Sequence, residues 1–219
     1  MIDKRDGADT TQATKLYFGS LPREFPQYES GFIGLSLHPE HDREILHDVT
    51  TTLPFDDESV QEVQVEEVLE HVEYGMVPRI FNDIWRVLSP EGHFRLSVPD
   101  YRSPVLSKRS VYDRDGNVVC DTMMGGKVYY NRETGEAGVR FTAGGGAHLW
   151  FPNYELVMKA IMDSGLRICR KIQWQHYWRN DSQWVANPYE AGRMPVKRSP
   201  PSDMRAEGKP ISIIVDFIK

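Results

Sequence analysis

The run from Asp48 to Asp100 constrains the fold more than any other part of the sequence. An acidic loop leads into a buried strand over residues 60–68, an amphipathic helix, a turn and a second buried strand that ends at Val98-Pro99-Asp100. Strands alternating with helices are typical of a parallel sheet covered by helices. Such sheets bind ligands beyond the carboxyl ends of their strands, so we expect a small-molecule cleft there. The polar residues at these strand ends are Asp48, Glu66, Glu67, Glu70, His71 and Asp100.

The helix within this run has the clearest signature in the chain. Its apolar residues recur at spacings of three and four, which places them on one helical face. Pro78 suits the first turn, and the sequence from Ser89 to Gly92 predicts the end of the helix. The apolar residues on this face are Val77, Ile80, Phe81, Ile84, Val87 and Leu88.

The remaining elements extend the same alternation. Short strands are expected at 15–19, 31–37 and 45–48, a helix from Asn153 to Gly165, and strands around 168–174 and 211–218. Prolines at positions 22 and 26 interrupt any long helix after the first strand. Two long stretches break the pattern. We interpret residues 101–152 as an insertion that forms an ordered lid, and 180–209 as an irregular loop. Residues 1–14 are expected to be a flexible tail, and 15–219 a single domain.

Composition excludes several classes of function. The 219 residues are 40% hydrophobic and carry a formal net charge of -6, which gives no overall attraction for nucleic acid or an anionic membrane. The two cysteines, Cys120 and Cys169, form no CxxC pair, so neither a disulfide scaffold nor a structural zinc site is expected. No long apolar segment or signal-peptide pattern occurs, and a cytoplasmic location is the default expectation. A basic group near the end of the chain is interpreted as solvated charge: Arg193, Lys197, Arg198 and Arg205.

Several segments together resemble class I S-adenosylmethionine-dependent methyltransferases, most closely the broad type 11 subgroup. His148, the helix ending at Ser164-Gly165-Leu166 and the last strand resemble later segments of the same family. The resemblance covers most of the chain from Lys15 onward, apart from the two long loops. The segments that carry it are Asp48-Val49, Leu53-Pro54-Phe55, Asp57, Ser59-Val60, Val68-Leu69-Glu70-His71, Arg86 to Gly92 and Leu96 to Asp100.

This resemblance implies a Rossmann-like, seven-stranded, mostly parallel α/β sheet with flanking helices and an antiparallel last strand. It also implies S-adenosylmethionine as the cofactor, bound across the carboxyl ends of the first strands. Matched to the family pattern, Gly19 and Ser20 begin the glycine-rich loop, and Ser36 stands where an acid usually holds the ribose. Asp48, with Val49 beside it, matches the acid that contacts the adenine amino group, and Glu67 lies near the methionine end.

Two departures from the family pattern concern this cofactor site. The glycine-rich loop is reduced to Gly19-Ser20-Leu21-Pro22, although close backbone approach favours residues without a Cβ atom. Ser36 offers a single weaker hydrogen bond in place of a charge-assisted pair, which could cost about 1–3 kcal/mol. Glu40 or Asp42 could compensate from nearby.

Methyl transfer needs an aligned acceptor and, for a hydroxyl or amine, a base. The candidates are His71, Asp100 and His148, each with a structural alternative: packing for the histidines and a turn cap for the aspartate. Glu70 with His71 suggests a metal, but no third ligand stands at a regular spacing, so no metal is expected. An aromatic cluster could stack on a sugar or belong to the core: Trp174, His176, Tyr177, Trp178 and Trp184.

Two functions remain open from the sequence. The first is a methyltransferase acting on a small-molecule or glycan-like acceptor, with oxygen as the preferred methyl acceptor. The second is a catalytically inactive, methyltransferase-like protein that serves as a binding or regulatory subunit, suggested by the altered glycine-rich loop and Ser36. Methylation of nucleic acid is disfavoured by the acidic charge balance.

Overall fold

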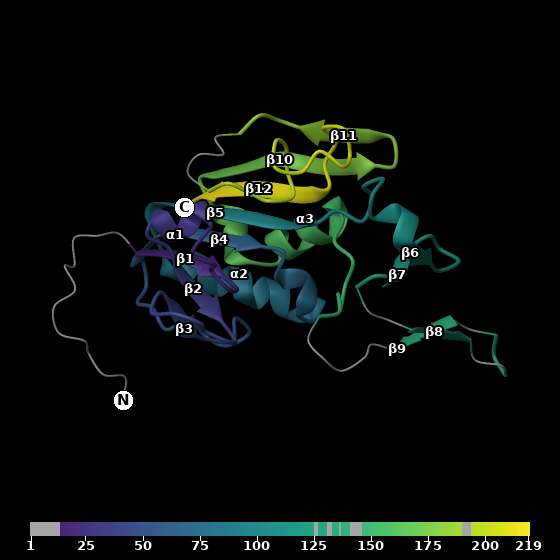
Figure 1. The fold of residues 1–219 in the computed structure, drawn as a ribbon, viewed down its shortest axis with the longest axis horizontal. Coiled ribbons are helices and arrows are strands. Elements are labelled where there is room, and N and C mark those ends of the chain that lie inside the picture. Colours follow the sequence, from purple (N-terminus) through teal and green to yellow (C-terminus); the bar gives the residue numbers. More distant parts are fainter. Residues whose placement is uncertain (1–13, 125–126, 131–132, 136, 141–145, 190–193) are drawn as a thin grey trace.

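A computed structural model describes residues 14–124, 127–130, 133–135, 137–140, 146–189 and 194–219. The expected N-terminal tail therefore lies outside the described residues, apart from Thr14. An eight-stranded sheet in the order β11-β10-β12-β5-β4-β1-β2-β3 dominates the molecule (Figure 1). Its strands are β1 (Thr14–Phe18), β2 (Ile33–Ser36), β3 (Glu44–Leu46), β4 (Val60–Glu66), β5 (Leu88–Pro99), β10 (Lys171–Asn180), β11 (Gln183–Ala186) and β12 (Ser212–Ile218).

The sheet is parallel on one side and antiparallel on the other. Strands β1 to β5 pair with one another in parallel, whereas β12 runs antiparallel to both β5 and β10. This arrangement confirms the expected class I methyltransferase fold. The eighth strand, β11, pairs antiparallel with β10 and lies within the stretch 180–209, for which the sequence predicted only irregular structure. The prediction was wrong here because the hairpin is short and its residues alternate weakly between polar and apolar.

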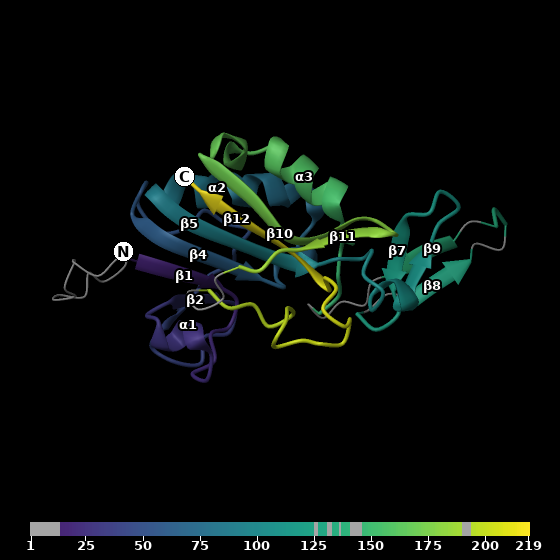
Figure 2. The same cartoon turned by 90° about the horizontal axis from the view of Figure 1, so that it is seen from above.

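One face of the sheet is apolar and carries the helices. Helices α2 (Val77–Val87) and α3 (Tyr154–Met162) both cover this face, as Figure 2 shows. The register places Val63 beside Phe94 and Val65 beside Leu96, and α2 buries the residues that its 3.6-residue periodicity predicted. Fully burying one such large side chain contributes about 1.5–3 kcal/mol. The hydrophobic core therefore lies between the sheet and these two helices.

The opposite face of the same strands is polar. Glu62, Gln64 and Arg95 alternate with the apolar residues of β4 and β5, and Asp216 stands beside Arg95 from β12. Among the described residues, one short helix, α1 (Pro26–Glu29), lies on this side, together with the chain that leads to β12 (Figure 2). The interruption expected from the two prolines is thus confirmed, and polar side chains fill the space that a longer helix would cover.

Residues 194–199, which we call the covering segment, cross this polar face. The Met194 side chain is fully buried beside Tyr17, Leu21 and Phe32. The Met194 carbonyl accepts a 2.6 Å hydrogen bond from Arg95. The polar face is therefore closed by irregular backbone, whose carbonyls are satisfied by side chains from the sheet.

The insertion contains two hairpins that project beyond one end of the sheet (Figure 1). One pairs β6 (Ser110–Tyr112) with β7 (Val118–Asp121), and the other pairs β8 (Lys127–Tyr130) with β9 (Ala137–Arg140). Within the expected lid, residues 125–126, 131–132, 136 and 141–145 lie outside the described residues. The remaining helical turns are η1 (Leu69–His71), η2 (Tyr74–Met76), η3 (Ser107–Arg109) and η4 (Gly165–Ile168).

Three expected boundaries differ from the structure. Strand β5 begins at Leu88, directly after α2, because Leu88 already pairs with Val60 while Glu91 adopts a left-handed φ of 61°. Helix α3 ends at Met162, before Gly165. Ile168 belongs to η4 and is 63% exposed, so it takes no part in the following strand.

Candidate active site

The loop after β1 keeps the backbone conformation that a cofactor loop needs. Gly19 has a φ of +100°, which disfavours any residue with a Cβ atom. Ser20 is exposed, whereas the Leu21 side chain is fully buried in the small cluster with Tyr17 and Phe32. Leu21, which stands where the family pattern has a glycine, thus directs its side chain into the protein interior, away from the exposed Ser20.

Ser36, at the end of β2, is buried and already engaged. Its hydroxyl lies 3.2 Å from the Ser20 hydroxyl and accepts a 3.1 Å hydrogen bond from the His38 amide. With only 3% of its surface exposed, Ser36 stabilises the turn after β2 and offers little to a ribose directly. The exposed residues of this turn, among them His38 and Glu40, face solvent instead.

Asp48 is exposed just beyond the end of β3. Its carboxylate accepts hydrogen bonds from the Thr50 amide at 2.9 Å and the Thr50 hydroxyl at 2.7 Å. These two bonds lower the pKa of Asp48, so the group is ionised at neutral pH. Val49 beside it packs against the main core. The pair therefore presents a fixed, charged acceptor at the strand end, as the adenine-binding prediction requires.

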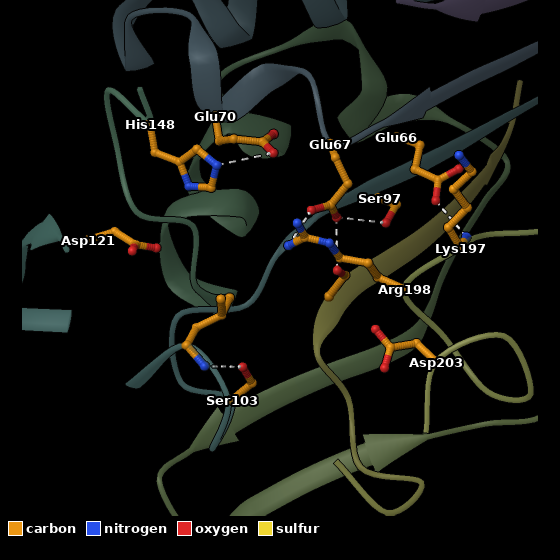
Figure 3. A network of polar contacts seen from close by, with 12 residues as sticks. Glu66, Glu67, Glu70, Ser97, Ser103, Asp121, His148, Lys197, Arg198 and Asp203 are labelled. Carbon is orange, nitrogen blue, oxygen red and sulfur yellow. Dashed lines mark hydrogen bonds and ion pairs between the residues drawn. The ribbon is translucent and has the colours of Figure 1, made fainter. Parts of the chain in front are cut away.

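Two glutamates at the end of β4 are held by the covering segment (Figure 3). Glu66 accepts a 2.6 Å hydrogen bond from the Lys197 amide, and its burial raises its pKa to about 7. Glu67 has a φ of 57° and pairs with Arg198 at 2.9 Å, while Ser212 donates to its other oxygen at 2.8 Å. Burial raises the pKa of Glu67, and the Arg198 charge opposes that rise. Glu67 is thus fixed beneath the expected methionine end.

Asp100 is completely buried, and both of its oxygens are used. One accepts the Arg102 amide at 3.0 Å and the other the Trp178 amide at 2.7 Å. Burial raises the pKa of Asp100 to about 7. These contacts correspond to the turn-capping alternative, and they join the end of β5 to β10.

His71 and His148 come together in the fold although they lie 77 positions apart in the sequence. Their rings pack edge to face with centroids 4.8 Å apart. The ring nitrogen Nδ1 of His71 donates to the Ala147 carbonyl at 3.1 Å, and Nδ1 of His148 lies 2.6 Å from the Tyr101 hydroxyl. Burial lowers the pKa of both, that of His148 to about 3, so both imidazoles are neutral at pH 7.

A cavity of about 1080 Å³ opens beside these histidines. Tyr101, which bonds to His148, lines it, as do Leu149 and Trp150, which follow His148 in the chain. Trp150 is anchored by a 2.7 Å hydrogen bond from its indole nitrogen to the Leu69 carbonyl. Of the aromatic cluster expected from the sequence, Trp178 lines the cavity, and Trp174 and Tyr177 pack against Tyr154 of α3.

Sequence reasoning missed three residues that organise this region. Glu44 accepts the Leu21 amide at 2.5 Å and the Glu40 amide at 2.7 Å, so one carboxylate fixes both loops around the cofactor position. Tyr101 donates a 2.6 Å hydrogen bond to Asp121, which lies in the insertion and also pairs with Arg109. An acid at the start of a strand and a tyrosine after a strand give no distinctive sequence signal, because their partners are distant in the chain.

The basic residues near the end of the chain are divided among acidic partners. Arg198 pairs with Glu67, and Arg205 pairs with Asp203 at 2.6 Å. Lys197 lies over the ring of Phe25 at 3.4 Å from its centroid. Arg193 lies outside the described residues. The described cations therefore support the interpretation of this stretch as dispersed charge, without a continuous basic face.

Comparison with known proteins agrees with the geometry. Residues 34–96 match the family model of a methyltransferase domain, type 11. An S-adenosylmethionine-dependent methyltransferase of Archaeoglobus fulgidus is similar in structure, with 9% identity, a TM-score of 0.53 and coverage of 94% of this chain and 86% of that one. A possible histamine N-methyltransferase of Thermotoga maritima is also similar in structure, with 12% identity, a TM-score of 0.53 and coverage of 95% of this chain and 83% of that one. No curated protein matches the sequence.

The sheet topology defines the class I methyltransferase fold. The family match is confined to residues 34–96, which extend from β2 into β5, and the chain as a whole shares the fold of these methyltransferases. The residues around the strand ends suit this cofactor, because the Gly19-Ser20 backbone is open and Asp48 is ionised and exposed. In the part of the chain that the structure describes, no helix has the length and apolar character needed to cross a membrane.

Proposed function

We propose that this protein transfers the methyl group of S-adenosylmethionine to an oxygen of a small, hydroxylated, glycan-like acceptor. The observation that carries the proposal is the cavity of about 1080 Å³ beside the two histidines. Its lining combines stacking surfaces with hydrogen-bonding groups, a combination that suits a sugar ring. The rings are Tyr74, Tyr101, Tyr112, Trp150, Phe151 and Trp178, and the polar groups include Arg102, Ser107, Asn117, Asn153 and Asp181.

The cofactor would lie across the ends of β1 to β4. Gly19 and Ser20 would contact it through their backbone, Asp48 would accept from the adenine amino group, and Glu67 would face the methionine end. When bound, S-adenosylmethionine supplies an electrophilic methyl group on a sulfonium. The protein's own contribution is then to hold an acceptor hydroxyl in line with that methyl and to receive the hydroxyl proton.

His71 is the best placed of the three predicted bases. Its side chain is 27% exposed, and its Nδ1 is committed to Ala147, which leaves Nε2 to accept a proton. His148 is deeper, and its low pKa makes it a weak base, so its role is to orient Tyr101 beside the cavity. Asp100 has both oxygens occupied and would act only by holding β5 and β10 together.

Calorimetry with S-adenosylmethionine and S-adenosylhomocysteine tests the cofactor half of this proposal. We expect micromolar binding, and we expect Asp48→Ala to weaken it by about one to two decades, because a charge-assisted hydrogen bond contributes about 1.5–3 kcal/mol. Asp56→Ala is the matched control, since Asp56 is an exposed acid in the following loop and should leave the affinity unchanged.

Transfer of a radiolabelled methyl group to a panel of glycosides, phenols and amines tests the acceptor half. Labelling of hydroxylated acceptors that is lost in His71→Ala supports the proposal. Labelling of amines alone would show that the methyl-accepting atom is nitrogen, not oxygen. Absence of binding for both cofactor forms favours the second function, an inactive binding or regulatory subunit. The observation behind that alternative is the engagement of Ser36 and both glutamates by protein groups.

A further inference from the structure

Glu70 is a buried carboxylate without a hydrogen bond. Only 1% of its surface is exposed, and neither side-chain oxygen has a hydrogen-bond partner. A buried carboxylate in this condition bears its full desolvation cost, which is why buried acids are normally paired or bound to a metal. Such a group requires either a proton or a cation.

Two imidazole nitrogens face the same carboxylate. The Nε2 atoms of His71 and His148 each lie 3.8 Å from Oε1 of Glu70, beyond hydrogen-bond distance. Figure 3 shows the His148 ring and the Glu70 carboxylate pointing toward each other. One ligand atom from each of the three residues lies within 4.8 Å of the other two. Metal bonds of about 2.1 Å in a tetrahedral site place ligand atoms about 3.4 Å apart, so a contraction of about 1 Å completes such a site.

The second nitrogen of each ring fixes which tautomer is present. A carbonyl only accepts, so Nδ1 of His71 must carry the proton that it donates to Ala147. The Tyr101 hydroxyl donates to Asp121, so it accepts from Nδ1–H of His148. Both Nε2 atoms therefore carry lone pairs, directed at the region of a third acceptor. Metal-binding histidines are oriented by outer partners in this same way.

The charge around the three ligands also suits a cation. Glu67 is neutralised by Arg198 and Asp121 by Arg109, so these carboxylates add little net charge. Glu70 with two neutral imidazoles supplies one negative charge and three donor atoms, the ligand set of many catalytic sites for divalent transition metals. The sequence did not indicate this set, because His148 is 77 positions beyond His71 and reaches it only through the pairing of Leu149 with Glu70.

We propose that Glu70, His71 and His148 bind one divalent transition-metal cation, with zinc as the reference metal, at the edge of the large cavity. Tyr101, which bonds to His148, and Leu149, which follows it, line the cavity, whereas the three ligands themselves lie just behind this wall. With the cation bound, Nε2 of His71 is a ligand and cannot also accept the hydroxyl proton. The cation would then lower the pKa of the acceptor hydroxyl in place of that base, a role that rests on the proposed function, whereas the binding site itself does not. Tyr101 acts as a positioning residue through His148.

Metal binding is measured directly on full-length protein that has been stripped with EDTA and dialysed. Calorimetry with ZnCl₂ should give one site per chain, and CoCl₂ should produce the visible absorption of a low-coordinate Co²⁺ site with nitrogen ligands. Glu70→Gln and His71→Asn should each weaken zinc binding at least about 100-fold, since even outer-shell partners are worth about 10–100-fold. Glu73→Gln is the matched control, because Glu73 is an exposed acid three positions along the same loop.

Thermal unfolding provides a readout that is independent of activity. Zinc at about 100 times its Kd should raise the Tm of the stripped protein by about 5–10 °C, and should leave Glu70→Gln unchanged. Without metal, Glu70→Gln should be at least as stable as the parent, because a neutral amide replaces a desolvated carboxylate, so it remains a folded test protein. If Glu70→Gln nevertheless unfolds, the same comparison of Tm with and without zinc is made on His71→Asn, because His71 is only partly buried.

Absence of one-to-one zinc and cobalt binding would overturn the proposal and assign a proton to Glu70 in place of the cation. Equal zinc affinity of the parent and Glu70→Gln would overturn it as well, because binding would then occur elsewhere. Affinity for S-adenosylhomocysteine is measured on the same stripped sample. A protein that binds this cofactor product without binding metal retains the proposed function and loses only the metal site.

Discussion

The buried pair of Arg95 and Asp216 offers the sharpest test of how the polar face of the sheet is closed. Two parallel hydrogen bonds of 2.7 and 2.8 Å join them, and only 2% and 8% of their surfaces are exposed. Gln175 donates a further 2.9 Å hydrogen bond to Asp216, and the Arg95 guanidinium stacks 4.5 Å from the centre of the Tyr189 ring. Arg95→Met removes the cation and leaves the carboxylate in place.

We expect Arg95→Met to lower the free energy of unfolding by about 3–5 kcal/mol, the usual cost of breaking a buried pair on one side. For a domain of this size, that loss corresponds to a fall in Tm of about 6–20 °C. The double variant Arg95→Met, Asp216→Leu should recover most of the loss, because no charge then remains buried. Urea unfolding followed by tryptophan fluorescence measures all three proteins under the same conditions.

The pH dependence of the free energy of unfolding provides a second test of this pair, because the direction of the change can be predicted. Arg95 and neighbouring donors hold the pKa of Asp216 well below its usual range despite the opposing effect of burial. In the parent, this stabilisation is fully present above a pH of about 4, the unfolded pKa, and is lost as the pH falls through the folded pKa. In Arg95→Met, burial still raises the folded pKa of Asp216, and only His93 and Gln175 remain to lower it, so the variant is penalised at neutral pH and relieved by acid. The difference between the two proteins should therefore narrow below about pH 5.

If Arg95→Met lowers the free energy of unfolding by less than about 1 kcal/mol, the range found for exposed ion pairs, this reasoning is refuted. Such a result would mean that water reaches Asp216 and that the covering segment does not close this face. A difference that widens in acid would be equally damaging, since it would reverse the sign of the Asp216 contribution.

Three further expectations concern the cofactor loop, α3 and the cavity wall. Gly34→Ala should cost about 1–3 kcal/mol and weaken S-adenosylhomocysteine binding, because its Cβ would lie 2.9 Å from Leu21 Cβ and 3.2 Å from the Gly19 carbonyl; unchanged affinity by calorimetry would contradict this. Asn153→Ala should cost about 1 kcal/mol in urea unfolding, since it removes the 3.0 Å cap on the Leu156 amide, while cofactor affinity stays constant. Trp150→Phe should cost about 1 kcal/mol by removing the indole donor and leaving the Leu69 carbonyl with only the 3.3 Å bond from the Val72 amide, and an unaltered Tm would argue against that anchor.

The strands and helices that pack on the apolar face could be predicted from the sequence, because burial on that face imposes regular spacing. The α2 periodicity and the apolar run of β12 both follow this rule. The polar face could not be predicted in the same way. Glu62, Gln64 and Arg95 look like solvent-facing positions of half-buried strands, and only the covering segment, about a hundred residues later in the chain, makes them interior.

The residues of the candidate site likewise differ in how far the sequence could predict them. Asp48 and Gly19 could be proposed from the sequence because a local pattern accompanies them, namely a strand end and a glycine turn. Asp100 was placed correctly at its strand end, but its two amide partners come from the following turn and from β10, which no local pattern reveals. Glu70 and His71 are grouped with His148 only because the end of the insertion packs against η1. The spacing of residues in the sequence therefore could not identify His148 as the third ligand.

The covering segment links the polar face to the cofactor cleft, and this link has a measurable consequence. Its backbone accepts from Arg95 at Met194, accepts from Gln64 at Pro195 with a distance of 2.9 Å, and donates to Glu66 at Lys197. The next residue, Arg198, holds Glu67, which we propose lies near the methionine end of the cofactor. Loosening the segment at Arg95 therefore releases Glu66 and Glu67 together.

Arg95→Met should consequently weaken cofactor binding, although Arg95 lies within β5 and away from its carboxyl end. If the segment is displaced in nine molecules of ten, the apparent Kd for S-adenosylhomocysteine rises about tenfold, because affinity scales with the competent fraction. Calorimetry at 10 °C, far below the Tm of the variant, separates this effect from unfolding, and Asn153→Ala controls for general destabilisation. An unchanged Kd alongside a large stability loss would show that Glu67 keeps its position without the segment, and that the cleft and the polar face are energetically independent.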